Sequence, residues 1–305
     1  MTVPATDHAR GRLMVFAATF FWGTSATLAR FVFREHDIPP LTVVELRLVI
    51  SMIVLGLWMA WRRPASLIVE RKDWGSFVLL GLLGVAAIQG GYYHSISVLG
   101  VGLAILIQYL APSLIVLWDL ARGAKLSGRI VGTLVAALIG TALLVGNSGT
   151  QLGRVRPIDW VISFSTAFTF AFYILYSKRV LKRYAPDTIL FYTFLVAGLA
   201  WAIVTPPWRI VQAGYDASMW GVFVVLAFTS ALVPFTLFYA GLRRMPAAEA
   251  GILATLEPVV AVVAAWVVLG EGLGPIQWLG AILVLIAAGL ASYGSGLTRR
   301  PRATP

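Results

Sequence analysis

The feature that most constrains this chain is an apolar run over residues 247–269 that carries a carboxylate and a helix breaker, Glu257-Pro258, near its middle. The run is long enough to cross a bilayer, since a spanning helix needs roughly 20 predominantly apolar residues. A charge at that depth costs roughly 2.5–3.5 kcal/mol on insertion scales, so it normally faces a protein interior or a wet cavity. Pro258 removes a backbone hydrogen bond, which predicts a kinked or broken helix.

The same pattern occurs 146 residues earlier, over residues 101–120, where Pro112 stands in the place of Pro258. Just upstream, Tyr93 stands in the place of Tyr239. The sequence therefore predicts one structural unit present twice. The two copies are not functionally equivalent, because the first has Ala111 where the second has Glu257.

Composition places the chain in a membrane. Hydrophobic residues make up 59% of it and charged residues 12%, whereas soluble domains carry about 25% charged residues. The mean hydropathy is +0.85. The absence of cysteine excludes disulfides and thiolate metal sites. The net charge of +11 does not indicate a nucleic-acid partner, because most basic residues lie in short loops between apolar runs, as topology signals do.

Ten apolar runs have roughly the length of a membrane span. They lie at about 13–33, 41–61, 74–98, 101–120, 129–147, 158–180, 188–205, 218–242, 247–269 and 276–296. If the N-terminus is cytoplasmic, the inner segments hold 18 basic residues and the outer segments hold 4. This bias predicts that both termini are cytoplasmic. No convincing cleavage site follows the first run, so we expect that run to be retained.

Ten helices in two matching halves give five helices per half, so the second copy must enter the bilayer from the opposite side. We therefore predict an all-α polytopic membrane protein with two inverted five-helix repeats, at 13–147 and 158–296. Inverted repeats with helices broken near the midplane are a transporter architecture. We also expect Gly90-Gly91 to interrupt the third helix and Pro234 to interrupt the eighth.

The fifth and tenth helices are rich in glycine, which lets helices approach closely. The glycines are Gly128, Gly132, Gly140, Gly280, Gly289 and Gly294. These two helices are predicted to form a scaffold or the seam of a homodimer.

These residues resemble those of a known family. The segment from Tyr239 to Gly289, its degenerate counterpart from Tyr93 to Gly140, and the stretch FFWGTSATLAR at 20–30 are similar to the EamA family of the drug/metabolite transporter superfamily. Arg47 matches the basic residue usual in that family's second helix. The resemblance implies ten helices and export of amino acids or related metabolites. The route would be a central cavity lined by helices one to four and six to nine. It also implies a bacterial inner membrane.

The candidate substrate-binding residues all lie within predicted spans, and most of them are close to the predicted helix breaks. They are Trp22, Gln89, Tyr92, Tyr93, His94, Gln108, Tyr109, Tyr173, Tyr239 and Glu257. Rings offer stacking and cation–π contacts, and the glutamines offer uncharged polarity. The alternative for any single aromatic is an interfacial belt, and for a glutamine it is helix packing.

Four ionisable groups have open alternatives. Glu257 is either a proton carrier or ammonium anchor, or a structural carboxyl that bonds the carbonyls freed by Pro258. His94 either titrates or donates to substrate, or packs between helices. Glu45 and Arg47 point to different sides of one helix. Either Arg47 meets a substrate carboxylate or Glu45 pairs across helices, and the shallow depth of position 45 in its span favours an interfacial role for Glu45.

Glu249 opens the ninth span beside Arg243 and Arg244. We interpret these residues as a surface ion pair.

The leading functional hypothesis is a secondary exporter of amino acids or similar metabolites that works by alternating access. The alternatives are efflux of cationic drugs and uptake of an organic solute. A membrane-embedded enzyme is disfavoured, because HExxH, GxSxG and paired intramembrane aspartates are lacking. No cofactor or metal is expected. The expected partners are a small-molecule solute and the lipid bilayer, with a homodimer through helices 5 and 10 left open.

Overall fold

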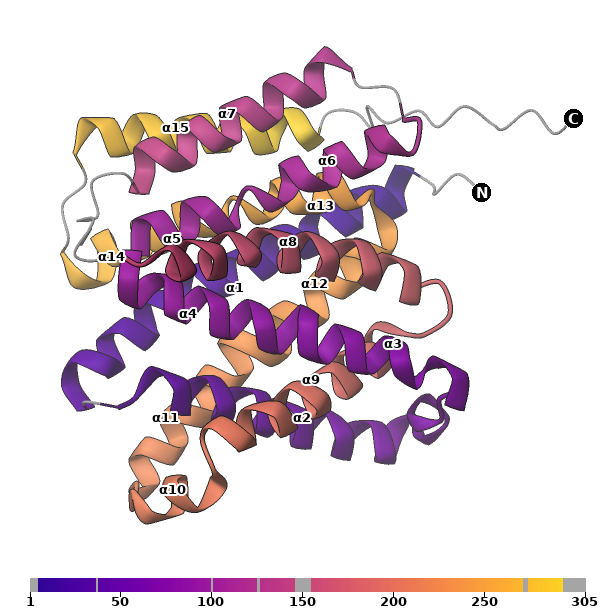
Figure 1. Cartoon of the computed structure of the whole chain (residues 1–305), viewed down its shortest axis with the longest axis vertical. Coiled ribbons are helices and arrows are strands. Elements are labelled where there is room, and N and C mark those ends of the chain that lie inside the picture. Colours follow the sequence, from indigo (N-terminus) through magenta and orange to yellow (C-terminus); the bar gives the residue numbers. More distant parts are fainter. Residues whose placement is uncertain are drawn as a thin grey trace, which may run out of the picture.

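The computed structural model describes residues 5–36, 38–99, 101–124, 127–145, 155–270 and 274–292. All regular structure in these residues is helical (Figure 1). The first half contains α1 (Ala5–His36), α2 (Pro40–Arg62), α3 (Trp74–Leu79), η3 (Leu80–Ala86), α4 (Ala87–Leu99), α5 (Val101–Gln108), α6 (Ala111–Ala121) and α7 (Gly128–Val145). Short turns η1 (Pro64–Leu67) and η2 (Arg71–Asp73) join α2 to α3.

The second half repeats this order. It contains α8 (Pro157–Val180), α9 (Pro186–Val204), the short α10 (Pro207–Gln212), α11 (Ala217–Ala227), η4 (Phe228–Leu232), α12 (Val233–Arg244), α13 (Ala247–Ala254), α14 (Glu257–Leu269) and α15 (Pro275–Ser292). The helix order matches the ten predicted apolar runs, with α3–η3–α4, α5–α6, α11–η4–α12 and α13–α14 each forming one composite helix. Of the calls made on the sequence, Gly294 lies outside the described residues.

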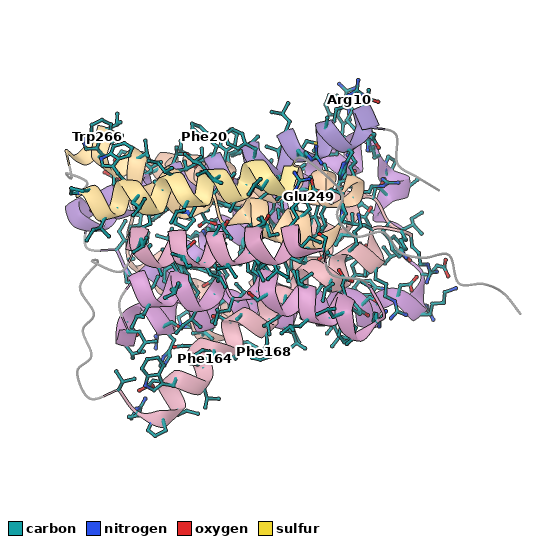
Figure 2. All side chains as sticks on the ribbon, turned by 90° about the horizontal axis from the view of Figure 1, so that it is seen from above. Arg10, Phe20, Phe164, Phe168, Glu249 and Trp266 are labelled. Carbon is teal, nitrogen blue, oxygen red and sulfur yellow. The ribbon has the colours of Figure 1, made fainter. Side chains whose placement is uncertain are left out.

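The helices have the length and surface of a membrane bundle. Eight of them are long and apolar enough to cross a bilayer by length and composition, and α15 adds a shorter apolar helix. The 32-residue α1 completes the bundle. Large apolar side chains point outward, among them Phe20, Phe164, Phe168 and Trp266 (Figure 2). Since an aqueous surface rarely exposes so much contiguous apolar area, the chain is an all-helical integral membrane protein.

The helix breaks predicted at Pro112 and Pro258 are confirmed. A turn at Tyr109-Leu110 separates α5 from α6, and a turn at Thr255-Leu256 separates α13 from α14. Each proline is the second residue of the helix that follows, where a missing N–H leaves no hydrogen bond unmade. The two breaks therefore lie 146 residues apart, at equivalent positions of the two halves.

The expectation that Gly90-Gly91 interrupts the third helix is wrong, because both glycines lie inside the regular helix α4. The irregular stretch is the π-helical η3, and its counterpart η4 ends 146 residues later, immediately before α12 with its Pro234. Gly91 serves close packing instead: a Cβ there would lie 2.8 Å from Thr166 Cγ2 on α8. π-Helical turns are rare and occur frequently at functional sites.

Helices α7 and α15, the fifth and tenth, lie side by side along one edge of the bundle (Figure 1). Their backbones touch, since a Cβ on Gly140 would lie 2.8 Å from Gly280 O and a Cβ on Gly280 only 2.5 Å from Leu144 N. Gly140 and Gly280 thus join the two halves within one chain, as the scaffold alternative for these helices requires, whereas a Cβ on Gly128, Gly132 or Gly289 would meet nothing within 4 Å.

Ion pairs join the halves at the end of the bundle where α1 begins. Glu249 of α13 accepts from Arg12 Nε at 2.6 Å and lies 3.0 Å from His8 Nε2, both on α1. The sequence interpretation of Glu249 as a surface partner of the arginines at 243 and 244 is therefore wrong: its side chain is only 7% exposed. Arg244 instead donates to Asp7 at 2.9 Å.

A second group at the same end joins the start of the third helix to the loop between α8 and α9. Arg183 donates to Asp73 at 2.7 Å, and Tyr184 donates to the same carboxylate at 2.6 Å. Burial, together with the bond to Asp73, raises the pKa of Tyr184 above its usual value, so its hydroxyl stays a donor. This end of the bundle is closed by contacts between the halves.

Candidate central site

A cavity of about 170 Å³ lies between the halves. Its walls come from α1, α2, η3, α4 and α5 in the first half and from α8, α11, η4, α12 and α14 in the second. Both π-helical turns contribute, through Gly84 and Val85 of η3 and Ser230 of η4. No residue of α7 or α15 is among those lining the cavity, in keeping with their scaffold position. Helix seven, α9, was expected to contribute to the wall and supplies none of the lining residues either.

Seven of the ten candidate binding residues line this cavity. They are Trp22, Gln89, Tyr92, Tyr93, Gln108, Tyr173 and Glu257. Tyr109 lies directly behind the wall, bonded to Glu257. Tyr239 is fully buried and shares a 3.4 Å hydrogen bond with Ser177 of α8. His94 lies apart, in a polar group described below. Their part in binding remains a prediction.

The side chain of Glu257 connects the helix breaks of the two halves. As the first residue of α14 it places its carboxylate at a helix N-terminus, where the macrodipole favours negative charge. Tyr109, at the break of the other half, donates its hydroxyl to Glu257 Oε2 at 2.8 Å. Among the described residues, the carboxylate thus bonds the opposite half, rather than the carbonyls freed by Pro258 as the structural alternative required.

Arg47 of α2 is the positive group of the cavity wall. Its Nε atom is buried and has no hydrogen-bond partner in the described part of the chain, and the same holds for Gln108 Oε1. Its neighbour Glu45 is not among the residues lining the cavity and is 2% exposed, so Glu45 is buried within the bundle, and its interfacial depth stays a prediction. Arg47 was absent from the candidate list although an intramembrane charge was a sufficient signal.

Two small hydroxyls of the wall, Ser25 and Ser230, also escaped the sequence analysis. Ser25 donates to Trp22 O at 2.9 Å, and Ser230 donates to Leu226 O at 2.6 Å. Serine hydroxyls commonly bond a preceding carbonyl in this way, and the oxygen of each keeps the capacity to accept a hydrogen bond. No sequence pattern separates these serines from the many others on apolar helices.

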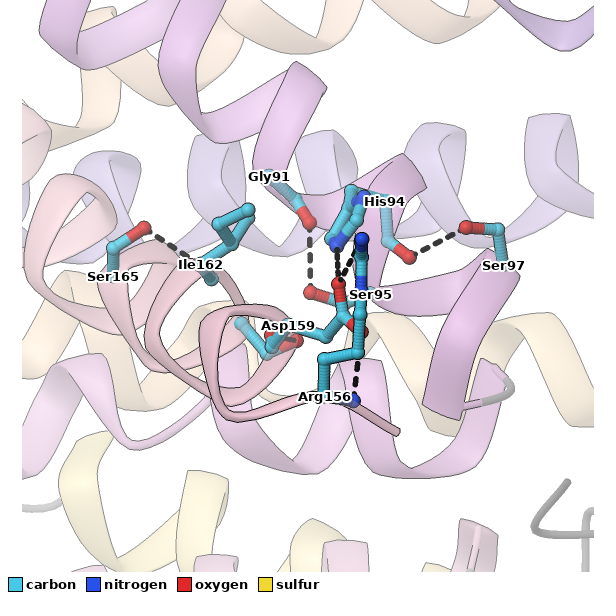
Figure 3. Close-up of polar contacts among 9 residues, drawn as sticks. Gly91, His94, Ser95, Ser97, Arg156, Asp159, Ile162 and Ser165 are labelled. Atoms are coloured by element: carbon cyan, nitrogen blue, oxygen red, sulfur yellow. Dashed lines mark hydrogen bonds and ion pairs between the residues drawn. The ribbon is translucent and has the colours of Figure 1, made fainter. Parts of the chain in front are cut away.

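His94 belongs to a polar group at the start of α8, together with Asp159 and Arg156 (Figure 3). Its Nε2 lies 3.1 Å from Asp159 Oδ1, which links α4 to α8. Arg156 surrounds the same carboxylate, with backbone N at 2.9 Å, Nε at 3.2 Å and a terminal nitrogen at 3.0 Å. These bonds raise the pKa of Arg156. His94 thus joins the two halves at the start of α8 rather than lining the cavity.

A membrane bundle in which broken helices from two matching halves meet at a polar cavity has the architecture of a transporter. Residues 9–146 and 160–293 match the EamA-like transporter family. The chain belongs to that family, and it is a membrane transporter rather than an enzyme. The two matched segments correspond to the two halves described above.

Relatives align over nearly the whole chain. The inner membrane transporter YicL of Salmonella typhimurium is 26% identical over 96% of this chain and 98% of its own. The threonine/homoserine exporter RhtA of Escherichia coli K12 is 27% identical, over 90% of this chain and 87% of its own. The transporter YwfM of Bacillus subtilis is 24% identical over 90% of each. A crystal structure superimposes with a TM-score of 0.74 at 21% identity, over 93% of this chain and 98% of its own, which supports the fold.

Proposed function

We propose that this transporter is a secondary exporter of amino acids or related small metabolites, which works by alternating access between its two halves. It would act in a bacterial inner membrane with both termini in the cytoplasm. The bias of basic residues supports that orientation. A relative named an inner membrane transporter and another named a threonine/homoserine exporter support the location and the solute class.

The observation that carries the proposal is the size and place of the cavity. At about 170 Å³ it is close to the roughly 150 Å³ cavity that accommodates benzene, so it suits a solute of a few heavy atoms. Drug-sized ligands use pockets of about 300–1,000 Å³. The cavity also lies where the helix breaks of both halves meet, so a movement of one half against the other changes its access.

Efflux of cationic drugs is the alternative from the same class, and uptake of an organic solute is another. Efflux of cationic drugs is less well supported by the wall of the cavity. Arg47 opposes a cationic solute, and the volume of about 170 Å³ opposes a large one. Proton coupling through Glu257 or His94 is a further hypothesis within the export proposal.

A homodimer through α7 and α15 stays an expectation. The outer faces of these helices carry exposed apolar side chains, such as Val135 and Ile139 on α7 and Ile282 and Leu285 on α15. Such faces fit lipid as well as a second copy. The mass of the detergent-purified protein by light scattering distinguishes the two.

The test is counterflow in proteoliposomes with labelled amino acids, including threonine, homoserine, alanine and phenylalanine. Saturable exchange that one chemical group competes is expected. A matched control is Arg209→Gln, because Arg209 lies exposed on α10 and away from the cavity. Absence of exchange for every amino acid, with folded protein, would overturn the proposal. Glu257→Gln tests coupling: retained exchange with loss of pH-driven accumulation is the result expected if Glu257 carries the proton.

A further inference from the structure

Two opposite charges face the central cavity from different halves of the protein. Arg47 comes from α2 and Glu257 from α14. Both line the same cavity, yet no ion pair joins them among the residues that the structure describes. The wall thus holds a cation and an anion that are not paired with each other.

Neither charge is satisfied by the protein around it. Glu257 receives one hydrogen bond, from Tyr109 at 2.8 Å, while a carboxylate has about four acceptor sites. Arg47 Nε and the nearby wall atom Gln108 Oε1 are buried without a partner in the described part of the chain. Buried polar groups in native proteins are nearly always hydrogen-bonded, so each exception needs an explanation. Charges kept at membrane depth commonly mark a substrate pathway.

We propose that Arg47 and Glu257 bind the two ends of one zwitterion, the guanidinium holding the solute's carboxylate and Glu257 holding its ammonium. This assignment rests on the proposed function and narrows it. The site then takes α-amino carboxylates and rejects both amines without a carboxylate and acids without an ammonium.

The chemistry of the wall supports this orientation. A guanidinium matches a carboxylate with two parallel N–H···O bonds. The free acceptor Gln108 Oε1 and the oxygens of Glu257 suit an ammonium, which has three donors and no acceptor. In the apolar surroundings of the cavity, an analogue that lacks one charge leaves its protein partner buried and unpaired, which is costly. Discrimination against such analogues is therefore expected to be strong.

The experiment measures binding to the full chain in nanodiscs by calorimetry. The ligands are the panel amino acid that exchanges fastest, its amino alcohol and its 2-hydroxy acid. For threonine these are threonine, threoninol and 2,3-dihydroxybutanoate. Wild-type protein is expected to bind the amino acid at least about 10-fold more tightly than either analogue, since a charged hydrogen bond contributes roughly 1.5–3 kcal/mol.

Variants of Arg47 and Glu257 test which residue binds the carboxylate of the solute and which binds its ammonium. In Arg47→Gln the preference for the amino acid over the amino alcohol is expected to disappear, with the affinity for the amino alcohol nearly unchanged. In Glu257→Gln the preference for the amino acid over the 2-hydroxy acid is expected to disappear. Arg47→Lys and Glu257→Asp keep the charge and are expected to keep the preference, which separates charge recognition from a folding defect. Arg209→Gln is the matched control at an exposed site.

Two results would overturn the assignment. One is a wild-type protein that binds all three ligands alike, and the other is a common loss of affinity for all three in both glutamine variants. In either case amino acid counterflow by the wild type would still support the proposed function. Failure of the proposed function has a different signature, because no panel amino acid would then be exchanged at all.

Discussion

The two broken helices have the same backbone and different side chains. In the first half the break at Tyr109-Leu110 precedes Ala111, and in the second the break at Thr255-Leu256 precedes Glu257. The first break supplies a phenol and the second a carboxylate, and the two bond each other at 2.8 Å. The repeated unit therefore kept the helix break in both copies, while divergent side chains made one asymmetric site out of two similar halves.

The largest expected effect comes from removing the side chain that only the second break has. Glu257→Ala is expected to lower counterflow on the order of 10- to 100-fold, since hydrogen bonds to charged groups contribute roughly 1.5–3 kcal/mol. Ala111→Ser, at the equivalent position of the first break, is expected to change it by less than about threefold, because a serine hydroxyl there can bond a preceding carbonyl. Initial rates in proteoliposomes measure both. Equal losses would show that the two breaks contribute alike.

The fifth helices of the two halves offer a contrast in stability. Gly280→Ala in α15 places a Cβ 2.5 Å from Leu144 N, and such overpacking costs typically about 1–3 kcal/mol. A Cβ added to Gly132 in α7 would meet nothing within 4 Å. Gly132→Ala is therefore expected to raise the free energy of unfolding by roughly 0.4–1 kcal/mol, because alanine lowers the conformational entropy of the unfolded chain. Thermal unfolding in detergent measures the two shifts. Shifts of the same sign would contradict the close contact between α7 and α15.

Sequence reasoning predicted the fold because its signals are strong. Apolar runs of spanning length fix the helices, and prolines in matching places such as Pro112 and Pro258 fix the breaks. The repeat offset of 146 residues then identified equivalent positions in the two halves, so residues near both breaks were predicted to line one site. Glu257 and the aromatic residues of the cavity were found in this way, because charge and rings at membrane depth are visible in a single sequence.

The remaining residues could not be placed because a single sequence does not show which helices touch. Glu249 was assigned to the arginines nearest in the sequence, whereas its partners lie on α1, more than two hundred residues away. His94 was predicted to bind the substrate because a single sequence does not show that its side chain contacts Asp159 on α8. Gly91 was interpreted as a break, although a glycine in an apolar helix serves close packing equally well.

Removal of one hydroxyl at each break separates the two halves most cleanly. Tyr109→Phe removes only the hydroxyl that donates to Glu257, and the ring keeps its edge contact with Phe170. We expect transport to fall about 10-fold, which corresponds to about 1.4 kcal/mol, with thermal stability nearly unchanged. The measurement is the initial rate of counterflow together with the dissociation constant of the amino acid.

The matched variant is Thr255→Val, the equivalent change at the second break. Thr255 donates to Ile252 O at 2.6 Å within its own helix end, so its hydroxyl supports the local backbone and reaches no group across the cavity. Its loss is expected to change transport by no more than about twofold, because a local bond that is present with and without the solute does not contribute to solute binding. If Thr255→Val slowed transport as much as Tyr109→Phe, the breaks would act through their backbones. The bond between Tyr109 and Glu257 would then be incidental to the site.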